Sequence, residues 1–147
     1  MEDASEIADR LHSVAIHLLR KARREDAGSG LSTACLSALS VIVFGSPLTL
    51  GQLAEVEQVR SPTMTRIVDQ LVAEGLAERE RVLDDRRRTL VRATPAGVRL
   101  MREGRWRRVA SLARDLAEFS GEELAVLERA ADLLERVVGR RHSEPLH

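Results

Sequence analysis

The sequence predicts a mainly α-helical fold with a small β-hairpin. Aromatic residues are only 2% of the 147 residues, so the core must consist of aliphatic side chains, which is typical of packed helices. Apolar residues recur at helical spacing in six stretches. Between the fourth and fifth stretches, two short strand-like runs flank an arginine-rich turn. The length corresponds to one domain.

The first two predicted helices are separated by a glycine-rich break. The first lies within residues 5–27 and stops before Gly28-Ser29-Gly30. Its apolar stripe comprises Ile7, Leu11, Val14, Leu18 and Ala22. The second helix begins after Ser32, whose hydroxyl can cap it, and runs to about Phe44. Gly45-Ser46-Pro47 ends it.

The next two helices are short and close together in the sequence. The third spans about 49–56. The fourth is expected to begin with Ser61 as its N-cap and Pro62 at the first helical position, and to end at Gly75-Leu76. Its apolar face comprises Met64, Ile67, Val68 and Leu71. The opposite face is polar, so one side can pack while the other meets a partner.

Strands are predicted at about 77–82 and 89–93, with the charged run Asp84-Asp85-Arg86-Arg87-Arg88 at the hairpin tip. Thr94 and Pro95 form a cap-plus-proline start for a long helix over about 95–119. The last helix begins at Ser120, where Glu123 completes a capping box.

From residue 47 to residue 97, this order is the layout of a winged helix-turn-helix, a device that reads duplex DNA. Arg66, on the polar face of the fourth helix, can donate two hydrogen bonds to a guanine. Arginines at the hairpin tip can enter a minor groove, and an aspartate there can hold an arginine in place. The candidate DNA-binding residues are Ser61, Thr63, Thr65, Arg66, Gln70, Arg86, Arg87 and Arg88, with Asp85 positioning the wing.

A solvated surface role explains any one of these residues equally well, and only their combination favours DNA. The net charge is zero, with 23 basic and 23 acidic side chains, whereas nucleic-acid binders are usually basic. Between residues 60 and 92 the balance is eight arginines minus six acids, or +2. A winged-helix module that binds protein instead of DNA is therefore the alternative.

The sequence from Leu48 to Gly97 resembles the MarR (multiple antibiotic resistance regulator) family of winged-helix repressors. The matching residues are Leu53-Ala54, Ser61, Thr65-Arg66, Leu71, Gly75-Leu76, Arg79, the wing motif Asp85-Arg86-Arg87 and the motif Ala93-Thr94-Pro95-Ala96-Gly97. Ala93 departs from the leucine that the family favours. The resemblance implies a homodimer that binds a pseudo-palindromic operator, with the fourth helix in the major groove and Arg87 in the minor groove. It also implies release by a small-molecule effector.

The apolar stripes of the terminal helices independently favour a homodimer, because one small lobe cannot cover them. The expected organisation is a single domain over residues 1–147. Its parts are a DNA-binding lobe at 32–94, a helical dimerisation region at 5–27 and 95–139, and a flexible tail at 140–147.

Other candidate sites have simpler explanations. Cys35 lies among apolar residues, so a buried inert thiol is favoured over a redox sensor. His12 and His17 share no helix face and have no companion ligands. Trp106 is expected to be a partly exposed aromatic residue. No catalytic, metal-binding or cofactor-binding motif is present, so we expect neither an enzyme nor a cofactor. With no signal peptide or membrane-length apolar run, the expected location is cytoplasmic.

Overall fold

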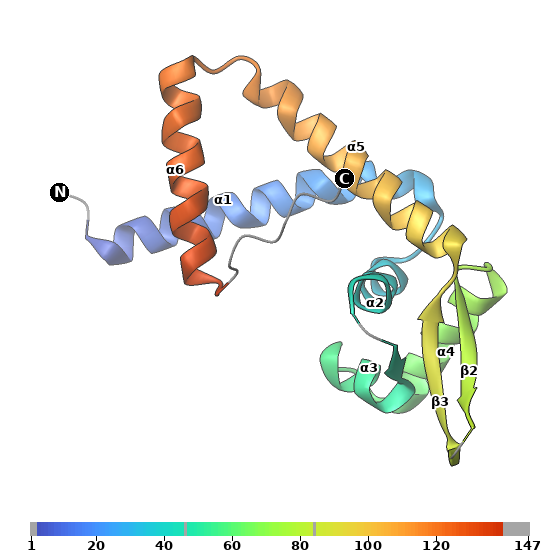
Figure 1. Ribbon diagram of the computed structural model, residues 1–147. Helices are drawn as coiled ribbons and strands as arrows, with labels where there is room; N and C mark the ends of the chain where they lie inside the picture. The colour runs from blue at the N-terminus through green and yellow to red at the C-terminus, as the bar shows by residue number, and fades with distance from the viewer. Residues whose placement is uncertain (1–2, 46, 84, 140–147) are drawn as a thin grey trace. The chain divides into compact units, whose positions relative to one another are not determined.

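The computed structural model describes residues 3–45, 47–83 and 85–139, except for the side chains of residues 85–87 (Figure 1). Its elements are α1 (Ala4–Glu25), the 3-10 turn η1 (Ala27–Ser29), α2 (Thr33–Phe44), β1 (Leu48–Thr49), α3 (Leu50–Val56), α4 (Ser61–Ala73), β2 (Ala77–Val82), β3 (Asp85–Ala93), α5 (Pro95–Leu116) and α6 (Gly121–Val137). The predicted mainly helical fold with a small β wing is confirmed. The predicted tail at 140–147 lies outside the described residues.

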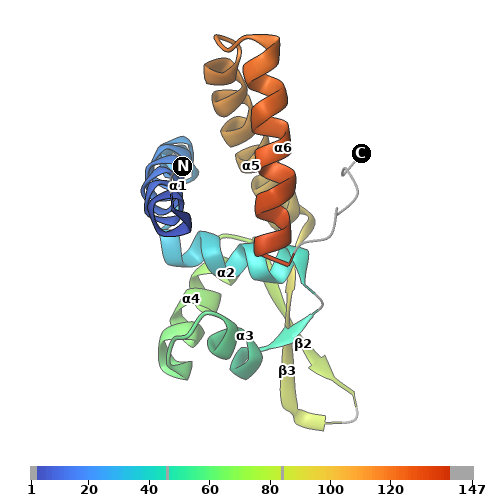
Figure 2. The ribbon, with the colours of Figure 1, turned by 90° about the vertical axis from the view of Figure 1, so that its left-hand side faces the viewer.

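A single aliphatic core lies under α4. The helix contacts α2, α3 and β2, and the β2–β3 hairpin extends past α3 (Figure 2). The largest side chains with less than 2% exposure are Leu39, Leu53, Met64, Leu71, Val68, Val91 and Cys35. The predicted apolar face of α4 is confirmed, with Ile67 only half-buried at its edge. This packing leaves the opposite face of α4 turned outward.

The sheet has three strands in the order β1-β3-β2, all antiparallel, so the two-strand prediction missed β1. The two residues of β1 pair with Val91 and Leu90, and two residues are too short for a periodic signal. β3 begins at Asp85 instead of Thr89, because Asp85 pairs with Val82 beyond an irregularity in the register that follows the Arg81–Thr89 pair. Arg86, Arg87 and Arg88 therefore lie within β3, in the irregular stretch next to the hairpin turn.

Most predicted helix caps are present. The hydroxyl oxygens of Ser32, Thr49 and Ser120 accept from the third following backbone N–H at 3.2–3.3 Å. The prediction for α4 was wrong by one residue, since its N-cap is Arg60. The Arg60 carbonyl already accepts from the Met64 N–H at 3.1 Å, which makes Ser61 the first helical residue.

Two turns around α4 use the same pattern of hydrogen bonds. After α3, the Val59 N–H donates to the Ala54 carbonyl, and Gln58 takes a left-handed φ of 54°. After α4, the Leu76 N–H donates to the Leu71 carbonyl, with Gly75 at a φ of 71°. Both are Schellman turns, which usually require glycine at the left-handed position. The turn that leads into α4 has a glutamine there instead.

The start of α5 is joined directly to the end of α4. Thr94 donates its backbone N–H to Leu76 and its hydroxyl to the Gly75 carbonyl, while the same hydroxyl accepts from the Gly97 N–H at 3.1 Å. A Cβ on Gly97 would lie 2.2 Å from the Leu76 carbonyl oxygen and 3.2 Å from a Leu39 methyl group. Only glycine fits this close approach.

The chain divides into two compact units, Met1–Arg108 and Val109–His147. Within the first unit, Asp26 after α1 forms a salt bridge with Arg108 of α5 at 2.5 Å. The terminal helices α1 and α6 contain no buried residue in the described chain. Their exposed large hydrophobic side chains include Ile7, Leu11, Val14, Leu18, Leu19, Leu124, Leu127, Leu133 and Leu134.

Across the described ranges, no single helix is long and apolar enough to cross a membrane. The bent pair Ala4–Ser29 and Thr33–Phe44 meets the length and composition criteria only jointly, with an angle of 92° between its two parts. The second member of that pair is α2, which contributes Cys35, Ala38, Leu39 and Ile42 to the buried core.

Candidate nucleic-acid interface

The outward face of α4 is centred on Arg66. Its position lies about half-way round the helix from the buried side chains of Met64, Val68 and Leu71. Among the residues that the structure describes, no hydrogen bond or ion pair involves the Arg66 side chain, which is exposed. Within the described residues, the N–H groups of the Arg66 guanidinium therefore donate to no protein acceptor.

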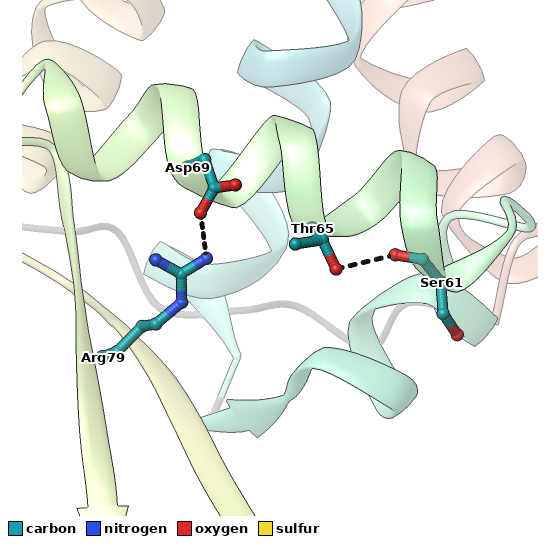
Figure 3. Close-up of polar contacts among 4 residues, drawn as sticks. All are labelled: Ser61, Thr65, Asp69 and Arg79. Carbon is teal, nitrogen blue, oxygen red and sulfur yellow. Dashed lines mark hydrogen bonds and ion pairs between the residues drawn. The ribbon is translucent and has the colours of Figure 1, made fainter.

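The hydroxyl residues predicted for the interface lie on the exposed surface of α4. Thr65 donates its hydroxyl to the Ser61 carbonyl at 3.0 Å, one helical turn earlier (Figure 3). That bond uses the hydroxyl proton inside the helix, which leaves the Thr65 oxygen as an acceptor. Ser61 and Thr63 are exposed in the first turn of the helix.

Gln70, also predicted for the interface, bonds to the neighbouring helix. The Cys35 thiol of α2 donates to the Gln70 side-chain oxygen at 3.2 Å, and the Gln70 side chain remains exposed. The two amide protons of Gln70 and the second lone pair of its oxygen are left for another partner. Cys35 itself is 1% exposed, which confirms the buried position expected for it.

An ion pair that the sequence reasoning missed lies beside these residues. Asp69 of α4 follows Thr65 by one turn, and its carboxylate accepts from the Arg79 guanidinium of β2 at 2.5 Å (Figure 3). The side chains are 58% and 32% exposed, respectively. The alternation of side chains along a strand could have revealed this pair. Arg79 follows the buried Ala77 by two residues, so both side chains lie on the face of β2 that packs against α4.

The remaining predicted residues lie in the wing. Asp85, Arg86 and Arg87 lie in β3, but their side chains fall outside the described part of the chain. Arg88 is exposed and borders an open hollow of about 370 Å³. The other residues that line this hollow are Thr49, Leu50, Gly51, Gln52 and Thr89. The hollow lies where the start of α3 meets the wing.

Within the described ranges, no group of three or more His, Cys, Asp or Glu side chains has the arrangement of a metal site. Trp106 is 70% exposed, as expected for a partly exposed aromatic residue. In α6, Glu123 accepts from the Ser120 backbone N–H and, less strongly, interacts with its hydroxyl, which lowers the pKa of the Glu123 carboxyl below 4.5.

Solved structures show the same fold. A MarR family protein from Bacillus stearothermophilus matches with a TM-score of 0.77 at 26% identity, over 92% of this chain and 95% of that one. A Mycobacterium tuberculosis protein matches with a TM-score of 0.82 at 22% identity, over 98% and 100%. A Staphylococcus aureus MepR variant, solved with a bound oligodeoxyribonucleotide, matches with a TM-score of 0.70 at 18% identity, over 94% and 99%.

Sequence comparison identifies the family. Residues 29–88 match the profile of the MarR family. An uncharacterised HTH-type transcriptional regulator of Mycobacterium bovis is 32% identical over 91% of this chain and 94% of its own length. An HTH-type regulator of Mycobacterium tuberculosis matches to the same extent. These matches confirm a regulator instead of an enzyme, and the chain belongs to the MarR family of helix-turn-helix transcriptional regulators.

Proposed function

We propose that the protein binds duplex DNA in a sequence-specific manner and represses transcription from the bound site. The observation that carries this proposal is the exposed Arg66, without a described protein partner, at the centre of the outward face of α4. A planar guanidinium held on a packed helix matches the two acceptors of a guanine in the major groove. The bound oligodeoxyribonucleotide in the MepR variant, a protein of the same fold, supports this role.

The other predicted residues have supporting roles. Ser61 and Thr63 lie in the first turn of α4, where hydroxyls and free backbone N–H groups suit a phosphate. Thr65 offers an acceptor and Gln70 offers amide protons. Arg86, Arg87 and Arg88 of the wing would contact the adjacent minor groove, with Asp85 positioning them.

We further propose a homodimer built by the helical regions 5–27 and 95–139, each protomer presenting its lobe (32–94) to one half of a pseudo-palindromic operator. The support is that α1 and α6 each expose large apolar side chains. Exposing such apolar stripes to water is unfavourable in free energy, so a second copy of the chain would stabilise them by covering them. A two-fold dimer would read two half-sites with the same residues. The place of action is the cytoplasm, where the DNA lies.

Release by a small-molecule effector belongs to the same proposal. An open hollow of about 300 Å³ lies beside the end of α2, where Ile42, Val43 and Val98 form an apolar wall. Arg92 also lines it, but its guanidinium bonds to Glu80 at 2.5 Å. The hollow therefore combines an apolar wall with polar groups, and loss of operator binding on adding a small molecule that binds there would test its role.

The alternative, a winged-helix module that binds protein, is favoured by the zero net charge. Duplex selection from a random pool with the purified protein separates the two. We expect one enriched sequence, with affinity that falls steeply as salt rises. Replacing Arg66 with Ala should cost about 1–3 kcal/mol on that sequence and much less on random DNA. No enriched sequence and no salt dependence would overturn DNA binding.

A promoter reporter tests repression, because an occupied operator should lower expression and a titrating operator plasmid should restore it. Sedimentation tests the dimer, and a monomer at micromolar concentration would contradict it. Both experiments use the full chain.

A further inference from the structure

Arg66 has an acidic neighbour on its own helix. Asp69 follows Arg66 by three residues, a spacing at which arginine and aspartate side chains pair on a helix surface. An Arg66–Asp69 pair would occupy the guanidinium that the proposed function assigns to DNA. It would also leave a carboxylate facing a polyanion.

The structure instead directs Asp69 away from Arg66. Its carboxylate is bonded to Arg79, which reaches α4 from β2 (Figure 3). Arg79 lies opposite the fully buried Val91 in the sheet, so its backbone is fixed by the core below it. Arg79 is thus a cation held by the sheet, whereas Arg66 is a cation on an exposed surface.

We propose that Arg79 is a positioning residue for DNA reading: by holding the Asp69 carboxylate, it keeps the Arg66 guanidinium free for a base. The inference rests on the proposed function, because it assigns a role to residues beside the same reading face. It predicts that Asp69 harms DNA binding when Arg79 is absent. It also predicts that Asp69 is dispensable when Arg79 is present.

This role can be separated from two simpler ones. If the ion pair served only to stabilise the lobe, removing either partner would weaken DNA binding equally. If Arg79 contacted a phosphate itself, its loss would weaken binding with or without Asp69. Only a positioning role makes the effect of Arg79 depend on Asp69.

The experiment measures affinity of the full chain for the selected duplex and for random duplex. We expect Arg79→Gln to weaken binding to the selected duplex about tenfold, the order that like-charge juxtaposition produces. Asp69→Asn should bind at least as tightly as the wild type. The double variant D69N/R79Q should return to within about threefold of the wild type, because the carboxylate that needed holding is gone.

The matched control is Arg92→Gln. It removes one cation from the same sheet, together with the exposed ion pair that Arg92 forms with Glu80 at 2.5 Å. This pair lies within the sheet and does not involve a residue of α4. We expect its affinity to remain within about twofold of the wild type, as for a peripheral surface pair. If Arg92→Gln lost as much DNA affinity as Arg79→Gln, the removal of one positive charge would explain both losses. That result would overturn the proposal. Thermal melts of all variants check that the lobe remains folded.

A DNA-free measurement tests the inference when the proposed function fails. The Arg66 side-chain N–H resonance should shift in Arg79→Gln, as Asp69 turns to Arg66, and should return in D69N/R79Q. An unshifted resonance overturns the positioning role, as does a double variant that binds DNA as weakly as Arg79→Gln. Failure of the wild type to select any duplex counts against the proposed function alone.

Discussion

The winged-helix lobe and the terminal helices α1 and α6 differ in how much of their apolar surface is buried. In the part of the chain that the structure describes, the thirteen buried hydrophobic side chains lie between residues 35 and 101 and form one core. α1 and α6 carry comparable amounts of Leu, Ile and Val, but none of these side chains is buried in the described chain. The lobe is therefore specified by its own contacts, whereas α1 and α6 bury no residue in the described chain, and the proposed dimer would cover them. Changes in the two regions should differ in size and in concentration dependence.

The largest effect is expected in the lobe core. Leu39 is fully buried, so Leu39→Ala removes apolar contacts and leaves a cavity, at a cost of about 2–5 kcal/mol. Urea unfolding at two protein concentrations measures it, and the loss should not depend on concentration. Leu18→Ala in α1, where the side chain is 47% exposed, is the counterpart from the other region. Its loss should shrink on dilution if a second copy covers α1, because the contact with that copy is lost in both proteins once they are monomeric. An equal loss at all concentrations would contradict the comparison.

The next effect concerns two glycines. Gly97→Ala would place a Cβ 2.2 Å from the Leu76 carbonyl oxygen, and such overpacking costs about 1–3 kcal/mol. Gly121→Ala at the start of α6 is the control, since nothing lies within 4 Å of its added Cβ. We expect a lower melting temperature for the first variant and an unchanged or higher one for the second. Equal melting temperatures of the two variants would show that the backbone around Gly97 can shift to accommodate the added Cβ.

A smaller, stabilising effect is expected at the turn before α4. Gln58 has a left-handed φ of 54°, which costs about 1–2 kcal/mol for a residue with a side chain. Gln58→Gly should remove that cost while losing part of it to backbone entropy, a net gain of about 0.5–1 kcal/mol. Gly75→Ala, at a φ of 71° in the matching turn after α4, should lose a similar amount. Chemical unfolding of both variants measures the two changes in the free energy of unfolding. A lower stability of Gln58→Gly would contradict the conclusion that the left-handed backbone of Gln58 is strained.

The smallest effect belongs to α6. Hydrogen bonds from Ser120 lower the pKa of the Glu123 carboxyl below its ordinary 4.5. The stabilisation from the ionised capping box is therefore complete above about pH 4.5 and is lost as the pH falls through the lowered pKa. Glu123→Gln should remove this part of the acid dependence, measured as helicity by circular dichroism between pH 6 and pH 3. An identical acid profile for the variant would contradict it.

Local signals predicted most of the fold. The cap residues Ser32 and Ser120 identified helix starts, and the apolar spacing of α4 identified its buried face, because both depend on neighbours in the sequence. The strand β1 was missed because its two residues form a strand only by pairing with β3. Asp69 and Arg79 were missed as a pair because they meet only after β2 packs against α4.

The junction of Thr94 and Gly97 has a consequence for communication within the first unit. Thr94 bonds to two carbonyls at the end of α4, and Gly97 leaves no side chain between the start of α5 and Leu76. These hydrogen bonds and the close backbone contact leave little room for relative movement. The first turns of α5 and the end of α4 are therefore expected to move together. A ligand that favoured one orientation of the first turns of α5 would therefore alter the affinity of α4 for the proposed DNA partner. By thermodynamic reciprocity, that partner alters the affinity for the ligand by the same factor.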